Sequence, residues 1–204
     1  MIYSSDEEEV EESIIQETHT LGGDEEEPPL IGLCSDINEE SMKEIILGLL
    51  TLNGGKILPD ENDDEKLRDI EFFISSNGGA VNDMFAIYDV MELVKNTRDI
   101  ATFGYGRVAS AAVVLLAAGT KGKRYISKNT RVMLHHCSSE LGGPHPSIRA
   151  SFAELKKVEA LMIEALAANS NVSVGEYYNI FSKNTDEYFS AAEVLEMGLV
   201  DKII

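Results

Sequence analysis

The sequence predicts an α/β fold made of βαβ units around a mainly parallel sheet. From residue 30 to the end, short apolar segments alternate with amphipathic segments of helical period, and this alternation is typical of parallel α/β proteins. Turn sequences separate them, such as SNGG at 76–79 and GGPHP at 142–146. A chain of 204 residues is long enough for one domain with a sizeable core.

The first half of the chain contains clear start signals and a strong helical period. A strand at 30–35 precedes a helix that we expect to begin at Asp36, with Glu39 completing a capping box. A polar loop at 53–66 leads to a strand at 69–75. The following helix, 80–96, has its apolar residues at positions 84, 87, 88, 91 and 94, which lie on one helical face.

The second half continues the alternation. The Ser190–Glu193 pair forms a second capping box ahead of AAEVLEMG. The predicted elements are a strand at 99–106, a helix from Ser110 to Gly119, strands at 123–127 and 131–136, a long helix at 147–170, a shorter helix at 172–182, a helix at 191–198 and a closing strand at 199–204.

Charge and composition exclude several classes of function. The net charge is −19, and residues 1–27 hold eleven acidic residues without a Lys or Arg, so we expect 1–29 to be a flexible acidic arm ahead of a domain at 30–204. A basic stripe for nucleic acid is missing, and the acidity disfavours anionic membranes. The N-terminus does not resemble a signal peptide, and the longest apolar run, 111–119, is too short to cross a bilayer.

The two cysteines indicate the compartment. Cys34 and Cys137 lie far apart and outside any metal-binding spacing. We therefore expect reduced thiols, a cytoplasmic location and no metal or other cofactor.

Ser110 stands in GRVASAA, directly before the apolar run VVLLAAG. Ser is a preferred helix N-cap residue, and the residues around it, taken alone, favour that interpretation. The alternative is a nucleophile at the start of a buried helix, where the backbone N–H of Ala111 could stabilise an oxyanion. Small neighbours would let a substrate backbone approach.

Further candidates accompany Ser110. The Gly78–Gly79 pair lets backbone N–H groups approach a ligand, although such a pair is more often a simple turn. Strand alternation sends His135 and His136 to opposite faces, so that one could face a cleft and no metal site forms. A serine nucleophile needs a base and an orienting carboxylate. The candidates for the acid are Glu176, Asp186, Glu187 and Asp201, with Asp186 expected in a polar turn between two helices, and the residues alone do not decide among them.

Four segments in order resemble the Clp protease proteolytic subunit (ClpP) family. They are FISSNGGAVNDMFAIYDVM, GRVASAAVVLLAAGTKGKRY, NTRVMLHH and DEYFSAAEVLEMGLVD, and the resemblance covers about 68–204, more loosely 30–67. It implies a ClpP/crotonase-like spiral of βαβ units. It also implies a protruding handle at about 138–169, whose long helix interlocks two heptameric rings.

The resemblance assigns roles to individual residues. ASAA matches the family's ASMG, which makes Ser110 the nucleophile, and His135 has the family's spacing from it and would be the base. DEYFSA supplies Asp186 as the triad acid, and Gly79 and Ala111 would supply the oxyanion N–H groups. The implied activity is serine endopeptidase cleavage of unfolded polypeptides. The implied partners are further copies of the chain, stacked as paired heptameric rings, a possible AAA+ unfoldase that consumes the ATP, and a possible second ClpP subunit type.

The chain departs from the family pattern at several positions. Thr185 replaces the Arg that usually precedes the triad acid and takes part in an inter-ring ion pair, and Tyr188 replaces a Phe. Ala111 replaces a Met, and His136–Cys137 replaces Gln-Pro. The acidic arm stands where the family has its axial segment and first helix.

Two other functions compete with an active peptidase. A catalytically silent subunit that modifies another ClpP ring would suit the unusual N-terminus, although the Ser–His–Asp set argues against it. A crotonase-like acyl-CoA enzyme also uses paired backbone amides as an oxyanion hole. Its CoA site would want basic residues near those amides, and Arg107 with the cluster at 121–124 is thin support for one.

Overall fold

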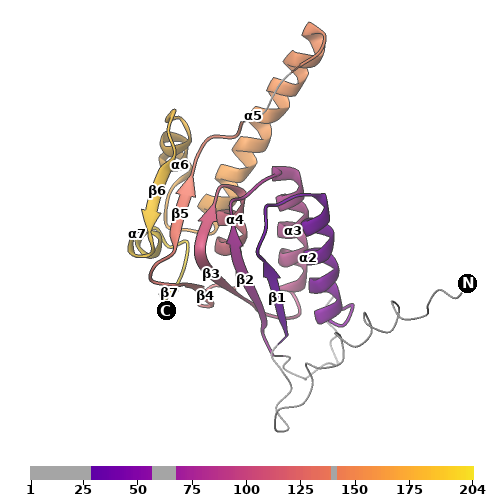
Figure 1. Cartoon of the computed structure of the whole chain (residues 1–204), viewed down its shortest axis with the longest axis vertical. Helices are drawn as coiled ribbons and strands as arrows, with labels where there is room; N and C mark the ends of the chain where they lie inside the picture. Colours follow the sequence, from indigo (N-terminus) through magenta and orange to yellow (C-terminus); the bar gives the residue numbers. More distant parts are fainter. Residues whose placement is uncertain (1–28, 57–67, 139–141) are drawn as a thin grey trace, which may run out of the picture.

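The computed structural model describes residues 29–56, 68–138 and 142–204. The expected acidic arm and most of the polar loop at 53–66 lie outside these ranges. Within them, every helix and strand belongs to one layered α/β body (Figure 1).

The sheet is mainly parallel, as the sequence predicts. Hydrogen-bonded neighbours follow the order β1–β2–β3–β4–β7, all parallel, while β5 pairs in parallel with the end of β3 and β6 pairs antiparallel with β5. The strands are β1 (Leu30–Leu33), β2 (Ile70–Ser76), β3 (Ile100–Ala109), β4 (Arg124–Ile126), β5 (Arg131–Leu134), β6 (Glu187–Ser190) and β7 (Lys202–Ile203).

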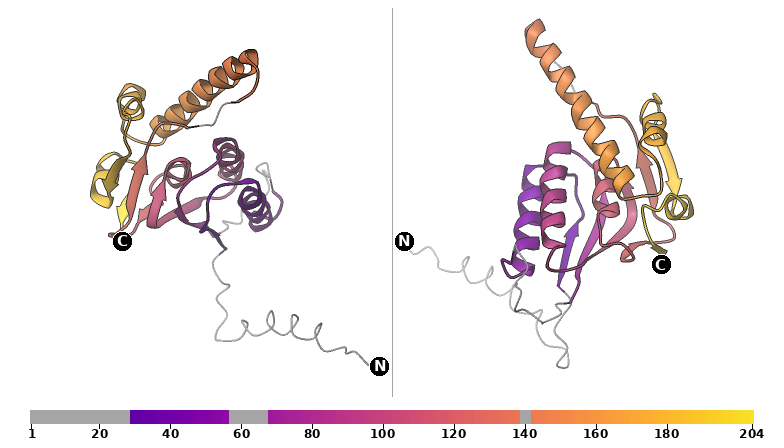
Figure 2. Two further views of the ribbon diagram at one scale, coloured as in Figure 1. Left: turned by 45° about the horizontal axis from the view of Figure 1, so that its top comes forward. Right: turned by 180° about the vertical axis from the view of Figure 1, so that it is seen from behind.

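The helices pack mainly on one face of the sheet, where α2, α3 and α4 lie side by side (Figure 2, left). Alternate residues of β2 point into this face and are fully buried, because successive strand side chains point to opposite sides. The helices are α2 (Glu39–Leu52), α3 (Val81–Val94), α4 (Ala111–Ala117), α5 (His145–Ala168), α6 (Val174–Phe181) and α7 (Ala191–Glu196).

The opposite face of the sheet carries a row of aromatic rings. Phe73 stacks on Phe103 and Tyr105 with centroid distances of 4.8 and 5.7 Å, and Phe103 stacks on Tyr125 at 4.9 Å. Cross-strand aromatic pairs of this kind stabilise a sheet. The row therefore joins β2, β3 and β4 on the side that the helices leave uncovered.

Helix α5 projects from the body over much of its length (Figure 1). Its buried residues are all in its last two turns, where Met162, Ile163 and Leu166 enter the core. The sequence predicts a long helix here, and the structure begins it at His145, two residues earlier than expected. No helix in the described ranges is long and apolar enough to cross a membrane.

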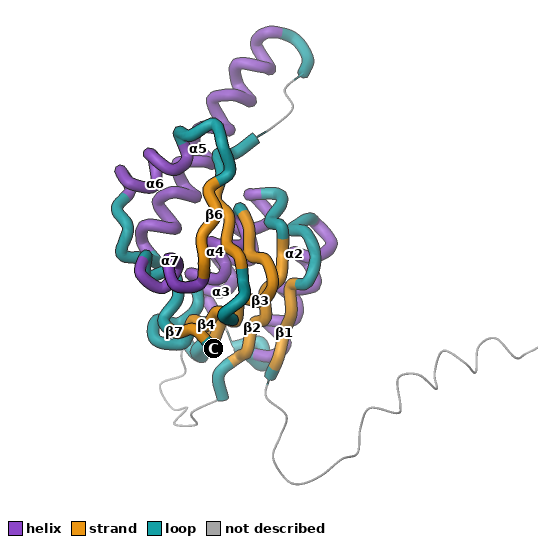
Figure 3. The backbone as a smooth tube through the Cα atoms, turned by 60° about the vertical axis from the view of Figure 1, so that its left-hand side comes forward, coloured by secondary structure: helices purple, strands orange, loops and turns teal. Residues whose placement is uncertain are grey.

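Two local predictions need correction. Helix α2 is capped by Asn38, whose side chain accepts hydrogen bonds from the N–H groups of Glu40 and Ser41, and the capping box is Asn38–Ser41 rather than Asp36–Glu39. Strand β6, which is labelled in Figure 3 and pairs with β5 in the sheet, was not expected at all. The Ser190–Glu193 capping box of α7 is confirmed.

Candidate active site

Ser110 lies at the junction of β3 and α4 in a strained backbone conformation. Its φ of 55° and ψ of −129° make it the single non-glycine residue with positive φ among those described. It occupies the N-cap position of α4, as the sequence favours, but its side chain makes no capping hydrogen bond, so its hydroxyl does not serve as a cap. Its N–H donates to the Met133 carbonyl at 2.8 Å, which fixes the junction to β5. Strain of this kind clusters at functional sites.

Gly78 makes room for this junction. A Cβ on Gly78 would lie 2.6 Å from the Ala109 carbonyl oxygen and 2.7 Å from the Ser110 Cβ. The residue also has a φ of +89°, which L side chains rarely adopt. The glycine turn after β2 therefore packs directly against the strained serine. The sequence indicated the turn, but it gave no sign of this contact.

Ser110, His135 and Asp186 come together at the ends of three neighbouring strands. The Nε2 of His135 is 2.9 Å from Oγ of Ser110, and its Nδ1 is 3.6 Å from Oδ1 of Asp186. The antiparallel register pairs Leu134 with Glu187. One step further along both strands, His135 faces Asp186, as directly opposed residues do.

The histidines lie beyond the end of the strand in which they were expected, and Asp186 lies next to a strand. Strand β5 ends at Leu134, so His135 and His136 follow it in irregular backbone, with ring centroids 6.2 Å apart. Asp186 directly precedes β6 and does not lie in a turn between two helices. Of the other acid candidates, Glu176 caps α6 and Asp201 binds Arg124, whereas Glu187 binds Lys183.

Gly79 and Ala111, the expected oxyanion donors, lie on the two segments that meet at Ser110. Gly79 forms a parallel bridge with Ile37, and its two hydrogen bonds use the Gly78 carbonyl and the Ala80 N–H. The Gly79 N–H is thus not consumed by this bridge. Ala111 is the first residue of α4, where N–H groups have no partner within the helix.

A cavity of about 750 Å³ opens beside these residues. Its wall is built from the glycine turn and the start of α3, the segments flanking residues 139–141, and one side of α5. The lining residues are Asp36, Asn77, Gly78, Gly79, Ala80, Val81, Asn82, Ser110, His135, Cys137, Ser138, Gly142, Ser151, Glu154, Leu155 and Val158. Asp36 also accepts a hydrogen bond from Asn77 at 3.0 Å, so the loop before α2 is tied to the glycine turn.

The segment after His135 is held by the protruding helix α5. The N–H of Cys137 donates to Glu159 Oε2 of α5 at 2.7 Å. Burial, with a smaller contribution from the Glu159 charge, raises the pKa of Cys137 to about 11, so this thiol is protonated at neutral pH. Both cysteines are free. The described residues contain no cluster of His, Cys, Asp or Glu that could hold a metal ion.

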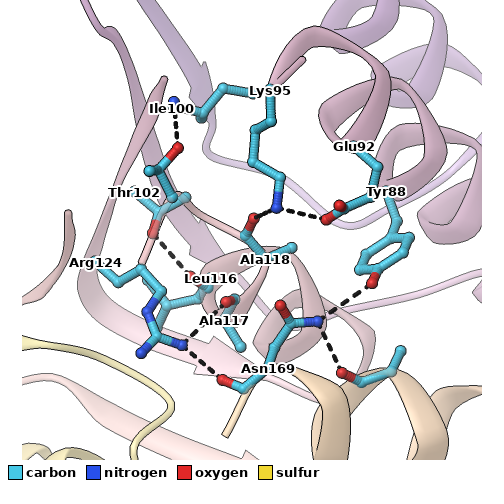
Figure 4. A network of polar contacts seen from close by, with 12 residues as sticks. Tyr88, Glu92, Lys95, Ile100, Thr102, Leu116, Ala117, Ala118, Arg124 and Asn169 are labelled. Carbon is cyan, nitrogen blue, oxygen red and sulfur yellow. Dashed lines mark hydrogen bonds and ion pairs between the residues drawn. The ribbon is translucent and has the colours of Figure 1, made fainter. Parts of the chain in front are cut away.

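Helix α4 has no polar side chain of its own, and the rest of the fold satisfies its C-terminal carbonyls (Figure 4). These carbonyls would otherwise be buried without partners, and two of the donors are cations, which favour a helix C-terminus. The bonds are Thr102 Oγ1 to Leu116 O at 2.8 Å, Arg124 Nη1 to Ala117 O at 3.2 Å, and Lys95 Nζ to Ala118 O at 2.8 Å.

Arg124 connects this helix end to α5. The same Nη1 donates to the Asn169 carbonyl at 2.6 Å, and Asn169 is the C-cap of α5 (Figure 4). The Asn169 amide in turn donates to the hydroxyl of Tyr88 on α3 at 3.2 Å. The ends of α4 and α5 are therefore joined through one guanidinium nitrogen.

The order of contacts, hydroxyl to imidazole to carboxylate, is the arrangement with which serine hydrolases activate a nucleophile. Comparison with known proteins gives the family. A model of the Clp protease family matches residues 27–204. The chain therefore belongs to the Clp protease family, and it is a hydrolase of the protease class.

Three curated relatives illustrate the similarity. The ATP-dependent Clp protease proteolytic subunit 2 of Thermobifida fusca is 33% identical over 175 residues, which cover 86% of this chain and 80% of the relative. Proteolytic subunit 1 of Leifsonia xyli is 36% identical over 174 residues, covering 85% and 82%. Proteolytic subunit 3 of Frankia casuarinae is 35% identical over 175 residues, covering 86% and 76%.

Proposed function

We propose that the chain is the proteolytic subunit of a Clp-type ring protease and hydrolyses peptide bonds of unfolded polypeptides with Ser110, His135 and Asp186. One observation carries the proposal: the His135 imidazole is 2.9 Å from the hydroxyl of a strained serine beside a cavity. A base within this distance can take the hydroxyl proton directly.

In the first half of the reaction, Ser110 Oγ attacks the scissile carbonyl while His135 Nε2 takes its proton. Asp186 orients the imidazole and stabilises the imidazolium through Nδ1, and it stays ionised. The N–H groups of Gly79 and Ala111 donate to the oxyanion of the tetrahedral intermediate. Collapse of the intermediate breaks the C–N bond, and His135 returns the proton to the leaving amine.

In the second half, His135 takes a proton from water as the water attacks the acyl-enzyme. The second tetrahedral intermediate collapses, Ser110 leaves with the proton from His135, and a carboxylic acid product is released. An extended peptide would lie beside the Gly79 segment and the chain around 142–146, with its backbone paired as an added strand.

Assembly and partners follow from the family. We expect residues 30–204 to form one peptidase domain, with 1–29 as an accessory arm. We further expect heptameric rings that stack in pairs through α5, and an AAA+ unfoldase that supplies unfolded substrate and consumes the ATP. The relatives are named as subunits of ATP-dependent Clp proteases, which supports such a partner.

The test is labelling with a fluorophosphonate, read by intact mass for the wild type and for Ser110→Ala, with the native mass recorded in the same run. We expect one label per subunit on an assembled particle and none on Ser110→Ala. An unlabelled assembled ring would contradict the proposal and favour a silent subunit that modifies another ring. Hydrolysis of acyl-CoA in place of peptide would favour the crotonase-like alternative.

A further inference from the structure

The acid of the candidate triad is exposed and needs a second contact. The Asp186 side chain is 47% exposed, and its Oδ1 is 3.6 Å from His135 Nδ1. An exposed contact of this length is weak, because water competes for both partners. A carboxylate that orients an imidazole must nevertheless hold one oxygen toward the Nδ1 proton.

The other oxygen of Asp186 has such a contact. The hydroxyl of Tyr188 donates to Asp186 Oδ2 at 3.2 Å. Residues two apart along a strand point to the same face, so β6 sets Tyr188 beside Asp186. With Oδ2 bound to the hydroxyl, the plane of the carboxylate is fixed and Oδ1 is directed toward His135.

The backbone of Tyr188 is held in place by strand pairing. Its backbone pairs with Met133 in the antiparallel β5–β6 ladder, and the Met133 carbonyl also accepts the N–H of Ser110. The strand pair that holds the nucleophile junction therefore holds the tyrosine. At the start of β6, Glu187 accepts hydrogen bonds from Lys183 at 2.8 Å and from Thr185 at 3.4 Å in the preceding turn, so that its carboxylate is bound away from His135.

We propose that Tyr188 is a positioning residue of the reaction, which acts by holding the Asp186 carboxylate in the orientation that His135 requires. This inference rests on the proposed function. Thr185 is the residue directly before Asp186. The hydrogen bond that orients the Asp186 carboxylate comes from Tyr188 of the same chain.

Tyr188→Phe leaves the sequence of the titratable groups around the pair unchanged. They are His136 beside His135, Glu187 and Lys183 on the turn of Asp186, and Asp36 and Glu154 on the cavity wall. A change in the pH profile of Tyr188→Phe would therefore report the lost contact with Asp186. Tyr188 is 51% exposed, so the fold should tolerate the substitution.

The experiment measures kcat and KM of the assembled particle on a fluorogenic peptide, across pH, for wild type, Tyr188→Phe, Asp186→Asn and the double variant. We expect kcat of Tyr188→Phe to fall roughly 3- to 10-fold with KM unchanged, the effect of one hydrogen bond. The acid limb of its pH profile should move to lower pH, since a carboxylate that is no longer held in orientation stabilises the imidazolium less. In the Asp186→Asn background, the Tyr188→Phe change should have no further effect.

Tyr178→Phe is the matched control, because Tyr178 is a similarly exposed tyrosine on α6. Its kinetics should equal those of the wild type. A Tyr188→Phe enzyme with wild-type kcat and pH profile would overturn the inference. It would also be overturned if the fold-losses of kcat in Tyr188→Phe and Asp186→Asn multiplied in the double variant, because independent effects multiply. The fluorophosphonate label on Ser110 separates this failure from a failure of the proposed function, which would leave the wild type itself unlabelled.

Discussion

At the scale of single residues, the strained backbone of Ser110 is the feature that the rest of the site supports. A non-glycine residue in such a conformation costs about 1–3 kcal/mol and persists only where its surroundings determine it. Here the Met133 carbonyl binds the Ser110 N–H, and Gly78 packs against its Cβ. The serine is thus held where its hydroxyl meets His135.

Gly78→Ala should disturb this arrangement. The added methyl group would meet the Ala109 carbonyl oxygen at 2.6 Å and the Ser110 Cβ at 2.7 Å, so the junction must shift. We expect fluorophosphonate labelling to slow at least roughly tenfold, and the free energy of unfolding to drop by about 1–3 kcal/mol, from backbone strain and overpacking. Labelling rates and urea denaturation measure both.

Gly122→Ala is the control that separates the effect of backbone strain from the effect of the steric contact with Ser110. Gly122 has the same φ of +89° as Gly78, but a Cβ there would meet no atom within 4 Å. Both variants should therefore share the conformational cost, and Gly78→Ala alone should slow labelling. Equal labelling of the two variants would show that the contact with Ser110 has no catalytic consequence.

At the scale of elements, α4 connects the hydrogen-bonded network at its C-terminal end to the site at Ser110. It is a fully buried apolar helix that begins directly after Ser110 and ends among side-chain donors from Lys95, Thr102 and Arg124. Seven residues span about 10 Å at 1.5 Å per residue, so Arg124 binds the helix end that lies about 10 Å from Ser110. Arg124 also binds Asp201 through Nε and Nη2 at 2.9 and 2.6 Å.

Arg124→Met should therefore be strongly destabilising. It leaves Asp201 with only the backbone N–H groups of Gly122 and residue 124, and it removes the donor to the Ala117 and Asn169 carbonyls. Breaking a fully buried ion pair costs about 3–5 kcal/mol, which is an upper bound for this partly exposed pair. Burial acts to raise the pKa of Asp201, but the bonds and charge of Arg124 outweigh it and hold the pKa low. The advantage of the wild type should thus be complete at neutral pH and shrink as the pH falls below about 4, the ordinary Asp range.

Urea denaturation at several pH values measures this difference. Lys123→Met is the control, because Lys123 is the adjacent residue and its ion pairs with Asp69 and Asp99 are partly exposed. Such pairs contribute about 0–1 kcal/mol. If the two variants lost similar stability, the Arg124–Asp201 pair would not be the main restraint on α4.

The sequence predicted elements where local signals were strong. The apolar period of α3 identified its buried face, and Ser190 with Glu193 marked the start of α7. The unexpected strand β6 is four residues long and owes its conformation to pairing with β5, a contact that no local pattern encodes. For the same reason, the residues alone left four candidate acids, while the β5–β6 register brings Asp186 opposite His135.

At the scale of the whole molecule, α5 is a helix with two different environments. Its last turns enter the core through Met162, Ile163 and Leu166, whereas its first turns extend beyond the body (Figure 1). Phe152 is 49% exposed there, with the Lys156 ammonium 4.8 Å from its ring centroid. A large apolar ring on a projecting helix is suited to burial against a second subunit.

Phe152→Asp should weaken the pairing of rings and leave the subunit folded, because Phe152 lies outside the core. Burying a Phe side chain contributes about 1.5–3 kcal/mol, and this is lost at each subunit of a proposed double ring, so single rings should dominate in native mass spectra. Circular dichroism melting should not change.

Phe152→Tyr keeps the ring and should assemble as the wild type does. An unchanged double ring in Phe152→Asp would mean that α5 pairs rings through other residues, and loss of the melting transition would mean that Phe152 supports the fold itself.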